Sequence, residues 1–223
     1  MRRVKVKICG LKREEDLMLA CELGVDIVGF VVGVPSSPRN LNIEEAARLM
    51  RGIPEGVRSA IVTVPQSLKQ LSEAYYKLKP DLIQVHGPLD LGKLRKELPE
   101  AIIIRALSVS SVDTLKEALS SLELVNGFLA DSFHSGKYGG TGITHNWYLS
   151  KRLKGAVYPK PLILAGGLNP NNVEEAVRYV KPYAVDVSSG VESTPGSKDP
   201  EKLRTFIRRA KGVQLEGDYP DLW

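Results

Sequence analysis

The stretch Ala-Val-Asp-Val-Ser-Ser-Gly-Val-Glu-Ser-Thr-Pro-Gly-Ser-Lys-Asp, residues 184–199, begins as a β-branched strand, breaks at small residues and leads into a helical pattern. Residues 162–170 repeat that order, with an apolar strand, two glycines and a helix start. Backbone N–H groups bared at strand-to-helix turns bind anions, and glycines let a ligand approach. An ordinary polar loop is the alternative for either stretch alone. Two such turns in succession favour a phosphate site.

Eight short apolar runs recur along the chain, separated by segments with helical periodicity. The runs span residues 4–9, 26–32, 58–64, 81–86, 102–107, 127–131, 162–166 and 184–188. The helical segments span residues 14–23, 43–50, 68–78, 91–98, 112–122, 173–180 and 201–210, with 147–153 as the helix candidate of an irregular sixth interval. Such β–α alternation predicts a parallel eight-stranded sheet, and eight units in one domain favour a closed (β/α)8 barrel, the TIM-barrel α/β fold, over an open doubly wound sheet.

The barrel domain is expected to span residues 1–211, and residues 212–223 to form a C-terminal extension that is either packed or frayed. In barrels of this kind the loops after strands seven and eight frequently hold phosphate. Those are the two turns that follow residues 162–166 and 184–188. The fold and the proposed anion site therefore support each other.

Composition limits the class of protein. The chain has 223 residues, 43% hydrophobic and 26% charged, as in ordinary globular domains. Its net charge of +5 is spread along the helices, which argues against nucleic-acid binding and suits a small anionic substrate. Two cysteines favour free thiols in a reducing compartment. No signal peptide or membrane span is expected, since no apolar run approaches ~18 residues, and the expected location is the cytoplasm.

Polar side chains interrupt strands that a parallel sheet should bury on both faces. They lie toward the C-terminal ends of the strands, the rim at which barrel enzymes place their active sites. The set comprises Lys5, Lys7, Cys9, Gln84, His86, Arg105, Asp131, Asp186 and Ser188. Strand alternation predicts that they face the barrel interior while their apolar neighbours pack on helices. The alternative is an interior network of ion pairs, to which Lys7, Arg105 and Asp186 could belong; a site is favoured.

Cys9 closes the polar face of the first strand, directly before Gly10. A lone cysteine is usually a small buried hydrophobic residue, and Cys21 is interpreted in that way. Lys7 lies two residues earlier on the same face, roughly 7 Å away along a strand. A cation at that range is expected to lower the pKa of the thiol, and the thiolate can take a proton or attack carbon.

Asp131 ends the sixth strand and His86 the fourth. A partly closed, apolar barrel mouth is expected to raise the pKa of Asp131, although the carboxylate could instead cap a helix or pair with Arg105. For His86, a hydrogen-bonding role and a catalytic role are equally open. The histidines are only three, His86, His134 and His145, and no metal-ligand spacing or Ser-His-Asp arrangement stands out. Metal catalysis is therefore not expected.

These motifs together resemble the phosphoribosylanthranilate isomerases of tryptophan biosynthesis. They are Lys7-Ile8-Cys9-Gly10, Ser37-Pro38-Arg39, Gln84-Val85-His86-Gly87, Gly139-Gly140-Thr141-Gly142, residues 165–170 and residues 185–192. The resemblance runs from about residue 4 to 211 in the family's order. It implies a cofactor-free Amadori rearrangement of N-(5′-phosphoribosyl)anthranilate to 1-(2-carboxyphenylamino)-1-deoxyribulose 5-phosphate.

The resemblance also implies roles for individual residues. Cys9 matches the family's general base, Asp131 its general acid, and Arg39 the arginine that faces the anthranilate end. The residues matching the phosphate-binding turns are Gly166, Gly167, Ser188, Ser189 and Gly190. Gln84, His86 and Asp186 complete the expected substrate-binding set. The only expected partner is this small phosphorylated molecule, with neither nucleic acid nor a membrane, and the expected state is a monomer or a homodimer.

Two positions depart from the family's pattern. His145-Asn146 precedes Trp147 where the family has Phe-Asp, but asparagine can still cap a helix. The third strand ends in Thr63-Val64 where the family usually has phenylalanine, which puts substrate packing near Thr63 in doubt.

Barrel geometry gives the acid–base assignment separate support. The short way from strand six to strand one passes strands seven and eight, so the phosphate turns should lie between Asp131 and Cys9. Two alternatives stay open. One is another phosphosugar-handling barrel enzyme, such as an epimerase or a related tryptophan-pathway enzyme, and the other is a non-catalytic sugar-phosphate-binding barrel.

Overall fold

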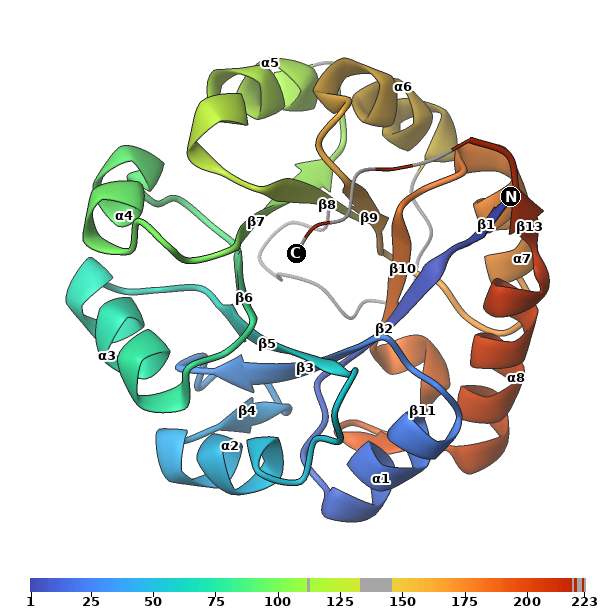
Figure 1. Ribbon diagram of the computed structural model, residues 1–223, viewed down its shortest axis with the longest axis horizontal. Coiled ribbons are helices and arrows are strands. Elements are labelled where there is room, and N and C mark those ends of the chain that lie inside the picture. The colour runs from blue at the N-terminus through green and yellow to red at the C-terminus, as the bar shows by residue number, and fades with distance from the viewer. Residues whose placement is uncertain (112, 133–145, 218, 220–221, 223) are drawn as a thin grey trace.

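Figure 1 shows the computed structural model of the chain, which describes residues 1–111, 113–132, 146–217, 219 and 222. Parallel strands close into a barrel that is surrounded by a ring of helices (Figure 1). The barrel strands are β2 (Lys5–Cys9), β3 (Ile27–Val32), β5 (Arg58–Thr63), β6 (Leu82–Val85), β7 (Ile103–Val109), β8 (Gly127–Ser132), β9 (Leu162–Leu164) and β10 (Ala184–Val187). Because β2 pairs with both β3 and β10, the sheet has no open edge, and the predicted (β/α)8 barrel is confirmed.

The helices follow the predicted periodic segments. They are α1 (Glu14–Glu22), α2 (Ile43–Met50), α3 (Leu68–Leu78), α4 (Leu91–Glu97), α5 (Asp113–Ser120), α6 (Trp147–Val157), α7 (Val173–Val180) and α8 (Pro200–Gly212). Side chains cap several N-termini, since Asn42 forms a capping box with Glu45 and Asp199 accepts from two backbone amides. Asn146 caps α6 by accepting from the Tyr148 amide, as the sequence predicted.

Two apolar layers form the core. The larger lies between the sheet and the helices and includes Val6, Phe30 and Phe128. The smaller fills the lower barrel interior with Ile27, Leu82, Ile104, Leu129, Ile163 and Ala184, all from the first halves of their strands or near them. Apolar side chains thus fill one end of the interior, whereas the other end combines polar groups with a small apolar cluster of Cys9, Val31 and Val62.

Arg105 does not face the barrel interior, and that prediction is wrong. Its register partners are Val85 and Phe128, both of the outer apolar layer. The guanidinium donates to the Gly87 carbonyl at 2.5 Å and to Glu117 of α5 at 2.8 Å. Asp131 therefore does not pair with it. Arg105 thus links strand β7 to the loop after β6 and to α5, outside the barrel.

The chain ends meet below the barrel. β1 (Arg2–Arg3) pairs antiparallel with β13 (Gln214–Leu215). Beyond that pair, Tyr219 and Leu222 pack against the lower interior layer. The Tyr219 ring lies 5.9 Å from that of Tyr183. Tyr219 and Leu222 therefore cover part of the interior at this end of the barrel.

Shorter elements lie in the connections between the barrel strands and the helices. They are β4 (Asn40–Leu41), the 3-10 turns η1 (Leu122–Leu124) and η2 (Ser189–Val191), and the hairpin of β11 (Glu192–Thr194) and β12 (Ser197–Lys198). Of the helices that the structure describes, none has the length and apolar character needed to cross a bilayer.

Candidate active site

A cavity of about 730 Å³, open mouth included, lies at the C-terminal ends of the barrel strands. Every predicted site residue lines it except Gly190. The lining residues from that set are Cys9, Arg39, Gln84, His86, Asp131, Gly166, Gly167, Asp186, Ser188 and Ser189. The sheet order β2–β10–β9–β8 places the two glycine-bearing turns between Cys9 and Asp131, which is the predicted arrangement.

Asp131 stands on one flank of the cavity, at the end of β8. Only 8% of the residue is exposed, and its Oδ1 accepts a hydrogen bond of 2.8 Å from the Ser132 amide. Burial raises the pKa of the Asp131 carboxyl to about 6, although that backbone hydrogen bond acts in the opposite direction. The structure thus agrees with the expectation that burial at the barrel mouth raises the pKa of Asp131. A carboxyl group with this pKa can carry and donate a proton near neutral pH.

Cys9 stands on the other flank, against Val31 and Val62. Burial raises the pKa of its thiol above the ordinary value and outweighs the positive charge of Lys7, which favours the thiolate. The prediction that Lys7 would bring this pKa down is therefore wrong in its net direction. The apolar wall beside the sulfur, which the sequence did not reveal, accounts for the difference.

Lys7 and Asp186 form an ion pair at the floor of the cavity. The lysine is completely buried, and its Nζ lies 2.9 Å from Oδ1 of Asp186. Burial lowers the pKa of Lys7, but the charges of Asp186 and Cys9 outweigh it, so the pKa lies above its ordinary value. The ammonium therefore stays charged next to Cys9. The ion-pair interpretation of Lys7 and Asp186 is confirmed, and Asp186 also lines the cavity.

Gly29 of β3 lies beside this pair, and the sequence analysis did not single it out. It is the register partner of Cys9. A Cβ atom there would lie 3.2 Å from Nζ of Lys7 and 3.3 Å from Sγ of Cys9. A glycine inside a strand often marks a close approach, and that signal was available in the sequence.

Gln84 and His86 lie next to each other on the cavity wall. Nε2 of Gln84 lies 2.8 Å from Nε2 of His86. Burial, together with the charges of Lys7 and Arg105, lowers the pKa of His86 to about 3. The imidazole is therefore neutral at physiological pH. It suits a hydrogen-bonding role better than charge pairing with phosphate.

The turns after β9 and β10 pack directly against their neighbours. Gly166 and Gly167 have φ values of 79° and 68°, which favour glycine. A Cβ on Gly166 would lie 2.3 Å from Oγ of Ser132, and a Cβ on Gly190 would lie 1.9 Å from the carbonyl oxygen of Leu168. The absence of a side chain at Gly190 therefore allows the two turns to pack closely. Gly190 itself does not line the cavity.

Two buried oxygens in the cavity wall lack hydrogen-bond partners among the described residues, Oγ of Ser188 and Oε1 of Gln84. Buried polar atoms are normally paired, because an unpaired one loses its hydration without compensation. Their presence in one cavity, with Gln84 on β6 and Ser188 after β10, indicates a polar ligand. Ser188 belongs to the turn after β10, where an anion was predicted.

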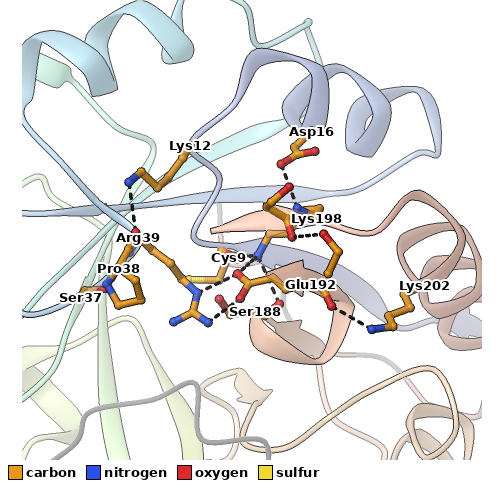
Figure 2. Close-up of polar contacts among 12 residues, drawn as sticks. Cys9, Lys12, Asp16, Ser37, Pro38, Arg39, Ser188, Glu192, Lys198 and Lys202 are labelled. Carbon is orange, nitrogen blue, oxygen red and sulfur yellow. Dashed lines mark hydrogen bonds and ion pairs between the residues drawn. The ribbon is translucent and has the colours of Figure 1, made fainter. Parts of the chain in front are cut away.

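Arg39 lines the cavity but is also held from behind (Figure 2). Its Nε donates to Oε1 of Glu192 at 2.8 Å, and its Nη2 donates to Oε2 at 2.6 Å. Lys198 also donates to Glu192, at 2.8 Å. No role for Glu192 or Lys198 follows from the sequence, because both fall in a stretch with the composition of a loop, which folds as the β11–β12 hairpin.

The motif Gly139–Gly142, His134 and His145 lie outside the described residues. Within the ranges that are described, no group of three or more His, Cys, Asp or Glu side chains has the geometry of a metal site.

Comparison with known proteins agrees with this geometry. The family model "N-(5'phosphoribosyl)anthranilate (PRA) isomerase" matches residues 6–209. An N-(5′-phosphoribosyl)anthranilate isomerase of Methanosarcina acetivorans is 41% identical, with 94% of each chain covered.

Solved structures are similar as well. The phosphoribosyl anthranilate isomerase of Thermotoga maritima superposes with a TM-score of 0.85 at 36% identity, covering 94% of this chain and 100% of that one. A phosphoribosyl anthranilate isomerase in complex with reduced 1-(o-carboxyphenylamino)-1-deoxyribulose 5-phosphate has a TM-score of 0.81 at 34% identity, with the same coverage. The chain belongs to the N-(5′-phosphoribosyl)anthranilate isomerase family.

Proposed function

We propose that this isomerase carries out the Amadori rearrangement of N-(5′-phosphoribosyl)anthranilate in tryptophan biosynthesis with Asp131 as general acid and Cys9 as general base. The observation that carries the assignment is that the two side chains stand on opposite flanks of one cavity, with the turns after β9 and β10 between them. A relative binds a ligand with a carboxyphenylamino group at one end and a 5-phosphate at the other. The cavity here offers Arg39 for the first and Ser188 with its turn for the second.

The reaction begins at Asp131. A ribose phosphate held by the β9 and β10 turns presents its ring oxygen to the buried carboxyl, which donates a proton to it. The C1′–ring oxygen bond then breaks, and the nitrogen lone pair forms an iminium with C1′. The pKa of about 6 leaves this carboxyl a usable acid at neutral pH.

Cys9 completes the reaction. The iminium acidifies C2′, and the thiolate removes the C2′ proton while that electron pair forms a C1′–C2′ double bond and neutralises the nitrogen. The resulting enolamine loses its 2′-hydroxyl proton and gains one at C1′, which gives the ketone. Acid and base can each supply ~10²–10⁴-fold in rate.

The working protonation states are opposite to those each group would hold alone. Cys9 must be a thiolate although burial raises the pKa of its thiol, and Asp131 must be protonated although its pKa is about 6. The active form is therefore a minority of the enzyme, and its two titrations belong to the coupled pair. Lys7 and Lys198 favour the thiolate, and their charges limit the cost of forming it.

Loss of anthranilate-type fluorescence during turnover tests the assignment. Cys9→Ser and Asp131→Asn should each lower kcat by at least ~10²-fold with little change in KM. Cys21→Ser is the matched control, because Cys21 lies in α1 and packs on the outer apolar layer. Phosphosugar binding without turnover in the wild-type protein would favour one of the alternative functions.

We further propose that the substrate is the only small-molecule partner and that the chain works as a monomer or homodimer in the cytoplasm. Sedimentation of the purified protein checks the oligomeric state. Fractionation of the source cells checks the location.

A further inference from the structure

Lys198 is a buried cation beside the C-terminal ends of β2 and β10, and only 3% of the residue is exposed. Its Nζ donates to the Cys9 carbonyl at 2.7 Å, to the Ser188 carbonyl at 3.2 Å and to Oε1 of Glu192 at 2.8 Å (Figure 2). An ammonium has three donor hydrogens, so these contacts use all of them. One side chain therefore joins the end of the base-bearing strand, the phosphate turn and the carboxylate that holds Arg39.

Glu192 joins Lys198 to Arg39. Oε1 accepts from both cations, and Oε2 accepts from Nη2 of Arg39. Burial raises the pKa of Glu192, but the hydrogen bonds and charges of the two cations outweigh it and leave the pKa below its ordinary value. Glu192 is therefore a carboxylate with fixed geometry, which costs little further entropy when a ligand arrives.

The side-on contact uses only one edge of the Arg39 guanidinium. Nε and Nη2 face Glu192, and Nη1 extends away from it (Figure 2). Arg39 lines the cavity, whereas Glu192 and Lys198 do not. The edge formed by Nη1 and the second Nη2 hydrogen is thus left for a ligand, and it can hold a carboxylate through two parallel hydrogen bonds.

We propose that Glu192 and Lys198 are positioning residues that fix Arg39 so that its free edge receives the anthranilate carboxylate. The proposal rests on the proposed function, because it is this substrate that carries a carboxylate. The charges within this group of three support it, since Arg39 and Lys198 share one carboxylate, that of Glu192. Glu192 thus serves specificity from behind Arg39 without touching the substrate.

Binding measurements test the proposal without relying on turnover. The probes are reduced 1-(o-carboxyphenylamino)-1-deoxyribulose 5-phosphate and its phenylamino counterpart without the carboxyl group, titrated by calorimetry. Glu192→Gln keeps the shape but weakens the hold on Arg39, so Kd for the first probe should rise ~10-fold or more and Kd for the second by less than ~3-fold. Lys198→Met should discriminate in the same direction.

Lys202→Met is the matched control, because exposed Lys202 donates to the backbone carbonyl of Glu192 at 2.9 Å and not to its carboxylate. Both Kd values should stay as in the wild type. In an Arg39→Lys background, Glu192→Gln should add little further discrimination, since both changes act on one contact.

Three results would overturn the proposal. Equal weakening of both probes in folded Glu192→Gln protein would make Glu192 merely structural. Tighter binding of the carboxylate probe would mean that Glu192 competes with the ligand for Arg39. Unchanged binding would mean that Arg39 is oriented without it. Carboxylate-selective binding without turnover would reject the proposed function while supporting this inference.

Discussion

Lys7 and Asp186 are direct register partners on the adjacent strands β2 and β10, and their charged atoms lie 2.9 Å apart at the cavity floor. The pair acts on both the proposed acid, Asp131, and the proposed base, Cys9. Lys7 lowers the pKa values of Cys9 and Asp131, while Asp186 raises both. The two charges therefore offset each other, and burial is left as the dominant influence on the thiol and the carboxyl. This balance is what permits a raised pKa at both ends of the cavity.

Removing the positive charge of Lys7 should raise the pKa of the Cys9 thiol further. Lys7→Met eliminates the positive charge nearest Cys9 while Asp186 remains, so the pKa of the thiol should rise above its wild-type value. The pH dependence of alkylation by iodoacetamide, in a Cys21→Ser background, measures this directly. Its midpoint should move to higher pH.

Lys7→Met also leaves the buried carboxylate of Asp186 without its partner, so the variant should lose about 3–5 kcal/mol of folding stability. Lys7→Met/Asp186→Asn should recover part of that loss. Unfolding in urea separates the two effects. An unshifted alkylation midpoint in the folded single variant would show that Lys7 has no electrostatic role toward Cys9.

The repeating pattern predicted the barrel because each β–α unit carries its own local signal. Cys9 and Asp131 could be found for the same reason, since the end of a strand is a local feature with a known place in a barrel. Arg105 was misplaced because both of its sequence neighbours, Ile104 and Ala106, are apolar, and alternation alone cannot say which face such a strand turns inward.

The contacts that Lys198 and Glu192 make at the rim could not be predicted from local patterns. Lys198 contacts the Cys9 carbonyl across 189 positions of sequence. Burial of a lysine in a stretch rich in serine and glycine has no periodic signature. The net direction of the Cys9 pKa shift was missed on the same ground, because it depends on Val31 and Val62 from other strands.

Asp131→Asn should make the protein more stable at neutral pH while it removes the acid. The pKa of Asp131 is about 6 when folded, against roughly 3.9 in an unfolded chain. The folded state thus binds the proton more tightly. In the wild type, the protonation of Asp131 contributes fully to the free energy of unfolding below about pH 4. This contribution is lost as the pH rises to about 6, and the loss is roughly 3 kcal/mol in all.

Urea unfolding at two pH values checks this prediction. The variant has no carboxyl to ionise, so it should be more stable than the wild type by up to about 3 kcal/mol at pH 7.5 and by little at pH 4. Equal stability of the two proteins at pH 7.5 would mean that Asp131 ionises in the folded protein without penalty.

Ser188→Ala should weaken phosphate binding without loss of stability. Oγ of Ser188 is buried and has no hydrogen-bond partner among the described residues, so its removal costs the free protein little. KM should rise ~10–150-fold with the melting temperature unchanged, since a hydrogen bond to a charged group contributes about 1.5–3 kcal/mol. Ser193→Ala is the control, because exposed Ser193 bonds only weakly, at 3.4 Å, within the β11–β12 hairpin. A large stability loss with unchanged KM would make Ser188 structural.

Gly29→Ala tests whether the strand beside Cys9 must be bare. Its Cβ would lie 3.2 Å from Cα and 3.3 Å from Sγ of Cys9, closer than side chains normally pack, so the thiol must shift away from its place. A displaced base should lower kcat by ~10-fold or more, while KM changes little because the phosphate turns are untouched.

Gly155→Ala is the control: Gly155 lies in α6 with no neighbour within 4 Å of the added Cβ. There alanine should stabilise the helix by about 0.5–1 kcal/mol and leave kcat as it is. Wild-type kcat in the folded Gly29→Ala protein would show that Cys9 has room to move and that its position on β2 is not what sets the rate.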